Sequence, residues 1–269
     1  MPQSEYYEYI QSLCLMDDIF MAKCFAGHNE CVDVLVRVIL GRDDLTIESS
    51  EIQKTLKGLG RSVILDINAR DKTGRKCNIE FQRKRRGAEP ERARFHTSMI
   101  DVNSLKPGQD FTELPEVYVI FITEHDVLGY GLPLYTIERT ITANGKSFGD
   151  RSHIVYVNCE QRDETTPLGR LVHDLFCTKA DDMHYDALAE RVRYLKEEQE
   201  GGAEMDEILE QIFRKKQRAL MANELEDKQK SIAEKMIAGG ELALTKIAEY
   251  TDLSLSTVMQ LAKKLEASQ

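Results

Sequence analysis

The stretch that decides the fold runs Val63-Ile-Leu-Asp-Ile-Asn-Ala-Arg70 and resumes, after a short connection, as Lys76-Cys-Asn-Ile-Glu-Phe-Gln-Arg83. Apolar and polar residues alternate in both halves, which is typical of β-strands because successive side chains point to opposite faces of a sheet. The pattern therefore predicts two strands, with Asp66 on one face of the first and with Glu80 and Gln82 together on one face of the second.

The connection Asp71-Lys-Thr-Gly-Arg75 between these strands predicts a turn, because its glycine can adopt a positive φ. A hairpin centred on this turn pairs residues whose numbers sum to about 146, which places Asp66 beside Glu80 and Asn68 beside Asn78. Directly opposed side chains have Cβ atoms roughly 5 Å apart. The two carboxylates are therefore expected to meet on one face of one hairpin.

Two carboxylates that meet on a partly buried face repel one another, so either one takes up a proton or a cation lies between them. We expect a divalent metal, Mg²⁺ or Mn²⁺, since Mg²⁺ prefers oxygen ligands and commonly uses one or two carboxylates. Asp66 and Glu80 are thus predicted metal ligands and catalytic residues, and Gln82 is predicted to orient water or phosphate. The alternative, a solvent-facing hairpin without a metal, fits less well with the apolar residues that flank both acids.

A basic segment follows the second strand directly. This segment, residues 83–94, contains six basic and two acidic residues. Its net charge is +4, whereas the net charge of the whole chain is −10. Such a strip suits the phosphate backbone of a nucleic acid, whereas the acidic total argues against a protein that coats DNA unselectively. The alternative is a solvated loop and helix start. The predicted phosphate-binding residues are Arg83, Lys84, Arg85, Arg86, Arg92 and Arg94.

Secondary structure around the hairpin is predicted from apolar periodicity and from capping residues. The near-continuous apolar run 117–123 predicts a strand that is covered on both faces, and Asn144-Gly145 predicts a hairpin turn. A helix over 17–40 begins at two aspartates and ends at Gly41, and another helix follows Pro90. The remaining predicted strands cover residues 46–57, 134–142 and 152–159.

From about residue 166 the pattern is helical to the end, with helices predicted over 166–178, 183–199 and 204–237. The last segment, Leu244 to Leu265, resembles a helix-turn-helix in which Ser254 can cap the second helix. It is open whether this tail contacts DNA, packs as a small helical hairpin or mediates dimerisation. Its predicted apolar frame consists of Ile247, Ala248, Leu253, Val258 and Leu261.

The six cysteines form no CxxC pair and are expected to be reduced thiols. His173 and Cys177 share a helical face, but zinc needs two further ligands and the spacing suggests none. His96, one turn after Arg92, is expected at the surface, with a phosphate contact as the alternative. Neither a signal peptide nor an apolar run long enough for a membrane span is evident. These features predict a cytoplasmic protein without a membrane partner, and they leave a homodimer open.

The hairpin residues resemble the signature of the PD-(D/E)XK nuclease superfamily, which is an Asp on one strand and Glu-x-Lys or Glu-x-Gln on the next. The chain is similar to one bacterial branch, the recombination-promoting nuclease and transposase family, over roughly residues 13 to 200. The short signature has low specificity, but an ordered series of motifs carries the resemblance. These motifs are Met16-Asp-Asp-Ile-Phe-Met21, Asn78-Ile-Glu-Phe-Gln-Arg83, Arg92-Ala-Arg-Phe95, Leu114-Pro-Glu-Val-Tyr-Val-Ile-Phe-Ile-Thr123, Gly149-Asp-Arg-Ser-His153 and Asp181-Asp-Met-His-Tyr185.

The resemblance implies an α/β fold with the restriction-endonuclease-like PD-(D/E)XK core, a central mixed β-sheet flanked by helices, and an all-helical C-terminal extension. We expect the nuclease core to span residues 1–165, a helical extension 166–240 and the helix-turn-helix-like tail 241–269. Arg94 matches a basic position of the family and is expected to contact phosphate.

The resemblance also implies roles within the site. Asp66 and Glu80 bind the metal, together with the backbone carbonyl of Phe81 as a third ligand. Gln82 takes the place of the superfamily lysine, and it can act only through hydrogen bonds because an amide is neither a cation nor a general base. Asp18 matches the acidic residue of the family's first helix, where it is either an accessory acid of the site or a plain helix cap.

The sequence therefore predicts a Mg²⁺-dependent DNA endonuclease that acts in recombination, mobile-element biology or defence. Glutamine in place of lysine keeps a second hypothesis open, a catalytically silent DNA-binding or regulatory protein that retains the nuclease fold. A third hypothesis is an interaction protein that acts through its helical tail. Loss of cleavage on substitution of Asp66 or Glu80 supports the first hypothesis, and DNA binding that persists in EDTA without cleavage supports the second.

Overall fold

The computed structural model describes residues 3–58, 60–198, 214, 218, 221, 223–240 and 242–266. The chain divides into two compact units, Met1–Ile208 and Leu209–Gln269, and each is described by itself. In the described part of the chain, no helix combines the length and the apolarity needed to cross a membrane. The domain limits expected after residues 165 and 240 stay a prediction.

A six-stranded sheet forms the centre of the first unit. Its strands are β1 Ile47–Leu56, β2 Val63–Asp71, β3 Lys76–Gln82, β4 Val117–Thr123, β5 Leu134–Ile137 and β6 Ser152–Asn158. They lie in the order β1-β2-β3-β4-β6-β5. The pairs β1–β2, β2–β3 and β5–β6 are antiparallel, whereas β4 is parallel to both β3 and β6. β4 is buried along its whole length, as its apolar run predicts, and the predicted mixed sheet is confirmed.

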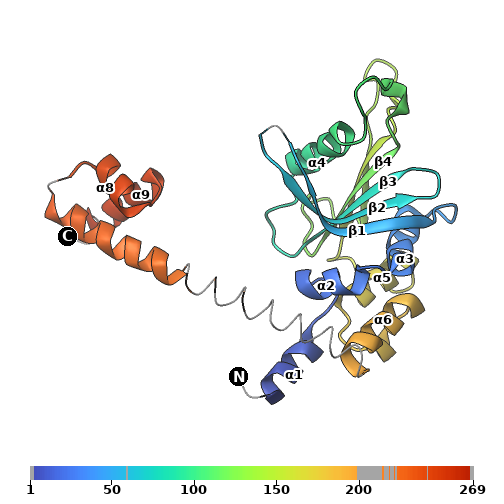
Figure 1. Ribbon diagram of the computed structural model, residues 1–269, viewed down its shortest axis with the longest axis horizontal. Coiled ribbons are helices and arrows are strands. Elements are labelled where there is room, and N and C mark those ends of the chain that lie inside the picture. Colours follow the sequence, from blue (N-terminus) through green and yellow to red (C-terminus); the bar gives the residue numbers. More distant parts are fainter. Residues whose placement is uncertain are drawn as a thin grey trace. The chain divides into compact units, whose positions relative to one another are not determined.

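Helices cover both faces of this sheet. They are α1 Gln3–Ser12, α2 Asp18–Phe25, α3 Asn29–Leu40, α4 Pro90–Val102, α5 Pro167–Phe176 and α6 Asp186–Glu197, with short 3-10 helices η1 Phe111–Glu113 and η2 Ala180–Asp182. Figure 1 shows α4 on one side of the sheet, where it contacts β4 and β6, and α2, α3, α5 and α6 grouped on the other. The arrangement is the α/β sandwich that the resemblance implies.

The predicted single helix over 17–40 is wrong, because two helices, α2 and α3, occupy this stretch. Gly27 between them has a φ of 75°, a left-handed conformation that ends a helix and that glycine adopts without strain. The predicted end at Gly41 is confirmed, with a φ of 60°. Asp17 precedes α2 at the cap position, but its side chain makes no capping hydrogen bond.

The β2–β3 hairpin has the predicted register, since Ile67 pairs with Ile79 and Asn68 with Asn78. Gly74 in the turn has a φ of 90°. The carboxylate of Asp71 accepts hydrogen bonds from the backbone N–H groups of the turn, as in an Asx turn. Sequence-local chemistry therefore fixes which residues of β2 and β3 face each other.

β1 has an irregularity beside this hairpin. Between the pairs Ile52–Ile67 and Lys54–Leu65, Gln53 adopts a φ of 52°, which is uncommon and strained for a residue other than glycine. Strained backbone conformations cluster at functional sites, where the surrounding structure enforces them. The β2 residue at the level of Gln53 is Asp66.

One buried lysine links the start and the end of the first unit. Lys196 of α6 is 8% exposed, and its Nζ donates hydrogen bonds to the carbonyl oxygens of Gln11 (3.1 Å), Leu13 (2.6 Å) and Thr178 (2.7 Å). Burial lowers the pKa of this amine. The three carbonyls satisfy all three of its N–H donors, so the segment before α2 is fixed to α6.

The second unit contains helical residues 223–239 followed by α8 Leu244–Thr251 and α9 Leu255–Glu266. Its small core joins Ala233, Ile247 and Val258, with other predicted apolar residues of the tail packed around them. Ser254 Oγ accepts a hydrogen bond from Thr257 N at the start of α9, so the predicted cap is confirmed. Residues 204–213 of the helix predicted over 204–237 lie outside the described residues.

Candidate active site

The carboxylates of Asp66 and Glu80 each bind the backbone of the neighbouring strand. Asp66 N donates to Glu80 Oε1 (3.2 Å), and Phe81 N donates to Asp66 Oδ2 (2.9 Å). Ile67 pairs with Ile79 in the hairpin, so Asp66 and Glu80 are the residues at the next position along the two strands. β2 and β3 thus bring both predicted acids to one place.

Burial gives this pair unusual electrostatics. Glu80 is 1% exposed. Burial, together with the negative charges of Glu80 and Asp18, raises the pKa of Asp66 to about 7, although the N–H of Phe81 and the cation of Arg92 act in the opposite direction. The residues therefore concentrate negative charge that a proton or a cation would relieve.

Arg92 of α4 forms an ion pair with one of these carboxylates. Its NH2 lies 2.8 Å from Glu80 Oε2, and its NH1 donates to the carbonyl of Gly87. Its guanidinium carbon lies 5.6 Å from the ring centroid of Phe121 on β4. The sequence predicted a phosphate contact for Arg92, and the structure shows this side chain at the carboxylates.

His96 is part of the same polar cluster, so its expected surface position is wrong. It is 2% exposed, and its ring packs 5.8 Å from that of Phe121. His96 lies four residues after Arg92 and three after the buried Ala93, so helical spacing placed it on the inner face of α4. This spacing could have predicted the burial of His96 from the sequence. The many charged residues around it instead suggested a surface position.

The hydrogen bonds of His96 define its tautomer. Arg92 Nε can only donate and lies 3.3 Å from Nε2 of His96, so Nε2 accepts and the ring proton lies on Nδ1. Nδ1 lies 3.5 Å from Glu80 Oε1 and 3.2 Å from the amide of Asn78. Asn78 Oδ1 lacks a hydrogen-bond partner among the described residues. An amide turned by 180° presents this oxygen to Nδ1–H and satisfies both groups.

Gln82 organises the basic segment that follows it. Its Nε2 donates to the carbonyl oxygens of Lys84 (3.3 Å) and Arg86 (2.7 Å). Gly87 has a φ of 108°, and a Cβ there would lie 2.8 Å from Gln82 Oε1. The amide therefore holds the loop 83–87 in a tight turn, and its predicted contact with water or phosphate stays a prediction.

The six residues of the basic segment differ in their surroundings. Arg83 forms ion pairs with Asp17 (2.6 Å) and Glu124 (2.9 Å), which orient it toward α2 and β4. Arg85 lies 3.9 Å from Glu160. Arg92 is partly buried, and the other five basic residues are exposed: Arg83, Lys84, Arg85, Arg86 and Arg94.

The donor set fits a hard divalent cation. Asp66 and Glu80 supply carboxylate oxygens, and the exposed Asp18 at the start of α2 is near enough for its charge to raise the pKa of Asp66. Mg²⁺ and Mn²⁺ prefer such oxygen ligands. Glu80 would have to share its carboxylate between the metal and Arg92, which contacts only Oε2.

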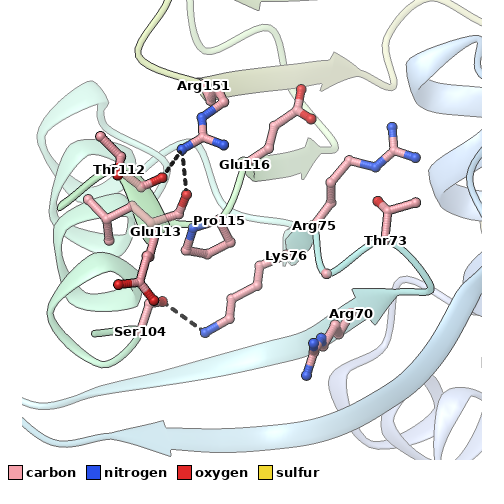
Figure 2. Close-up of a pocket in the computed structure, with 12 residues that line it drawn as sticks. Arg70, Thr73, Arg75, Lys76, Ser104, Thr112, Glu113, Pro115, Glu116 and Arg151 are labelled. Carbon is pink, nitrogen blue, oxygen red and sulfur yellow. Dashed lines mark hydrogen bonds between the residues drawn. The ribbon is translucent and has the colours of Figure 1, made fainter. Parts of the chain in front are cut away.

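A cavity of about 520 Å³ lies at the opposite end of β3, where several cations gather (Figure 2). Three of its cations have protein partners. Arg151 donates to the carbonyls of Thr112 and Leu114, and Lys76 donates to Ser104 Oγ (2.8 Å). Arg75 forms ion pairs with Asp71 (2.7 Å) and Asp44 (3.0 Å). Glu80 follows Lys76 by four residues, roughly 13 Å along a strand. This cavity is separate from the carboxylate pair.

Comparison with known proteins identifies a family for the chain. The family model described as PD-(D/E)XK nuclease family transposase matches residues 38–237. No curated protein and no solved structure gives a significant match. The matched region covers most of the chain and contains β2, β3 and α4, on which the carboxylates and Arg92 lie. The chain therefore belongs to the PD-(D/E)XK nuclease family of transposases.

Proposed function

We propose that this protein is a divalent-metal-dependent DNA endonuclease that acts in recombination, mobile-element biology or defence. The observation that carries the proposal is the contact between Asp66 and the buried Glu80 on adjacent strands, where burial and the charge of Glu80 raise the pKa of Asp66. Family membership supports a nuclease role, and the exposed basic residues of the loop after β3 support a phosphodiester substrate.

We propose a separate role for each group of residues in the site. Asp66, Glu80 and the carbonyl of Phe81 would hold Mg²⁺ or Mn²⁺, which supplies charge neutralisation and a more acidic water when bound. Arg92 and His96 orient the Glu80 carboxylate from α4. The basic loop and Arg94 bind the DNA backbone. Gln82 keeps that loop folded through its hydrogen bonds to the backbone, and its proposed second role is to orient water or phosphate.

Plasmid cleavage with Mg²⁺, Mn²⁺ or EDTA tests the proposal. We expect Asp66→Asn and Glu80→Gln to lower the cleavage rate on the order of 10³-fold or more, because each removes a ligand of a metal that contributes several kcal/mol. Asp101→Asn is the matched control, since Asp101 is a half-buried carboxyl of the same unit with a raised pKa. Equal rates in the parent and both site variants would show that the assignment is wrong.

A second function, a catalytically silent DNA-binding protein, is favoured by one observation. Glu80 is almost fully buried and already pairs with Arg92 at 2.8 Å, an arrangement that neutralises the acid without a metal. This function predicts DNA binding that persists in EDTA and no cleavage with any divalent ion. Deletion of residues 203–269 separates both functions from a role of the tail alone, because a nuclease core retains cleavage after the deletion.

A further inference from the structure

A second group of metal-binding side chains lies away from the hairpin. It consists of Glu164 in the loop before α5, His173 on α5, and His184 between η2 and α6. One ligand atom from each residue lies within 4.8 Å of the others, and His184 Nε2 is 2.9 Å from Glu164 Oε2. The two imidazole rings meet edge to face at 4.9 Å.

A buried carboxylate positions both histidines. Asp174 is 0% exposed, and its oxygens accept hydrogen bonds from the backbone N–H groups of His184 (2.8 Å) and Tyr185 (2.8 Å). Its Oδ1 also lies 3.2 Å from Nδ1 of His173. A proton on Nδ1 leaves Nε2 of His173 with a free lone pair, which is how metal-binding histidines are commonly oriented.

The loop that carries Glu164 is held closely against α5. Thr166 Oγ1 accepts a hydrogen bond from Gly169 N and caps the helix, and Asp163 Oδ1 accepts one from Thr165 N. A Cβ at Gly169 would lie 1.8 Å from the carbonyl oxygen of Asp163, so only glycine permits this approach. Glu164 is thus fixed beside the histidines through its backbone, while its side chain is 51% exposed and able to move.

We propose that Glu164, His173 and His184 form a binding site for a transition metal of the Zn²⁺ class, distinct from the nuclease centre. Two imidazole nitrogens and one carboxylate are a known Zn²⁺ ligand set that leaves a fourth position for water. Nitrogen donors disfavour Mg²⁺ and Ca²⁺. Zn²⁺ ligands lie about 2.0–2.2 Å from the ion, so tetrahedral donors are roughly 3.4 Å apart. Side-chain rotations that move the donor atoms by roughly 1–1.5 Å bring the cluster to that size.

The metal would connect three segments that the fold brings together. The loop before α5, the helix itself and the connection to α6 would share one ion, which replaces the hydrogen bond between His184 and Glu164. Binding to the folded protein alone stabilises it by linkage. Zn²⁺ is therefore expected to raise the midpoint of thermal unfolding.

Calorimetric titration of the full chain with Zn²⁺, in an excess of Mg²⁺ that occupies the carboxylate pair, tests the proposal. We expect one equivalent of Zn²⁺ to bind the parent, and His173→Gln, His184→Gln and Glu164→Gln each to weaken binding by roughly tenfold or more. His125→Gln is the matched control, because His125 also pairs with a glutamate (Glu160, 3.2 Å) at similar exposure but lacks a second histidine in the described structure.

Two measurements keep the outcome interpretable. The unfolding midpoints of the metal-free variants show whether a substitution has damaged the fold, and the half-exposed Glu164 is the substitution least able to do so. Co²⁺ absorption reports nitrogen and oxygen coordination directly. Failure of the parent to bind Zn²⁺, or equal binding by the parent and the His173→Gln/His184→Gln double variant, would overturn the proposal.

Discussion

The two candidate metal centres of the first unit are built in opposite ways. Asp66 and Glu80 lie on adjacent strands of one hairpin and offer only oxygen, and Glu80 is buried while Asp66 is partly buried. Glu164, His173 and His184 come from a loop, a helix and a connection, offer two nitrogens and are partly exposed. Strand alternation and a short turn make the first centre visible in sequence, whereas the second depends on packing between segments without a regular spacing.

The largest expected effect is the loss of DNA cleavage on substitution of Glu80, and it distinguishes the two centres. Glu80→Gln should lower the DNA cleavage rate on the order of 10³-fold and leave Zn²⁺ affinity unchanged, whereas His184→Gln should do the reverse. The reason is that the two ligand sets share no residue. Plasmid cleavage and Zn²⁺ titration on the same preparations measure both. Loss of both properties in either variant would indicate one connected site or a damaged fold.

Gly169→Ala is expected to lower the free energy of unfolding by about 3 kcal/mol, because the new Cβ would overlap the carbonyl of Asp163 and the loop has to move. The movement also displaces Glu164, so Zn²⁺ binding should weaken while cleavage is retained. Chemical denaturation measures the change. Gly60→Ala is the control, since a Cβ there would meet no described atom within 4 Å. Equal stability of the two variants would contradict the close approach at Gly169.

The carboxylate pair should make metal-free stability depend on pH. The pKa of Asp66 is about 7 in the folded protein and 3.8 in its ordinary state, so folding favours the protonated acid. Its contribution to stability is fully present below pH 3.8 and is lost as the pH rises through about 7. The stability of the parent relative to Asp66→Asn should therefore fall as the pH rises through this window in EDTA. A flat difference across this window would contradict the raised pKa.

Mg²⁺ provides the complementary measurement. Because the metal binds the ionised acid, its stabilising effect on the parent should grow over the same pH window. The Glu164→Gln variant should behave like the parent, because the nitrogen-containing centre does not bind Mg²⁺.

The smallest effect concerns the DNA backbone. Arg94→Ala should weaken DNA binding in the presence of Ca²⁺ a few-fold, because the exposed Arg94 supplies one phosphate contact. The slope of log affinity against log salt should fall by about 1. Arg37→Ala on α3, an exposed arginine outside the basic segment, is the control. An unchanged salt slope for Arg94→Ala would show that Arg94 does not contact the DNA backbone.

Much of the fold was predictable because its signals are local. The hairpin register follows from the turn at Gly74, and β4 follows from its apolar run. The break at Gly27 was missed because residues on both sides continue a helical pattern, and the burial of His96 was missed because tertiary packing, not polarity, decides which face of α4 is covered. The roles of Asp66, Glu80 and Gln82 in catalysis remain predictions.

The contacts of Lys196 have a consequence for the order in which the protein is completed during synthesis. The carbonyl of Leu13 receives its hydrogen bond from a residue 183 positions later. At translation rates of about 5–20 residues per second, the first residues wait roughly 10–40 s for that partner. The carboxylate hairpin needs only a local turn and can form early, while the segment before α2 and its apolar residues depend on α6. An arrested or truncated chain that ends before Lys196 would therefore expose Leu13, Cys14 and Leu15, and a chaperone that binds apolar segments would find its first target there.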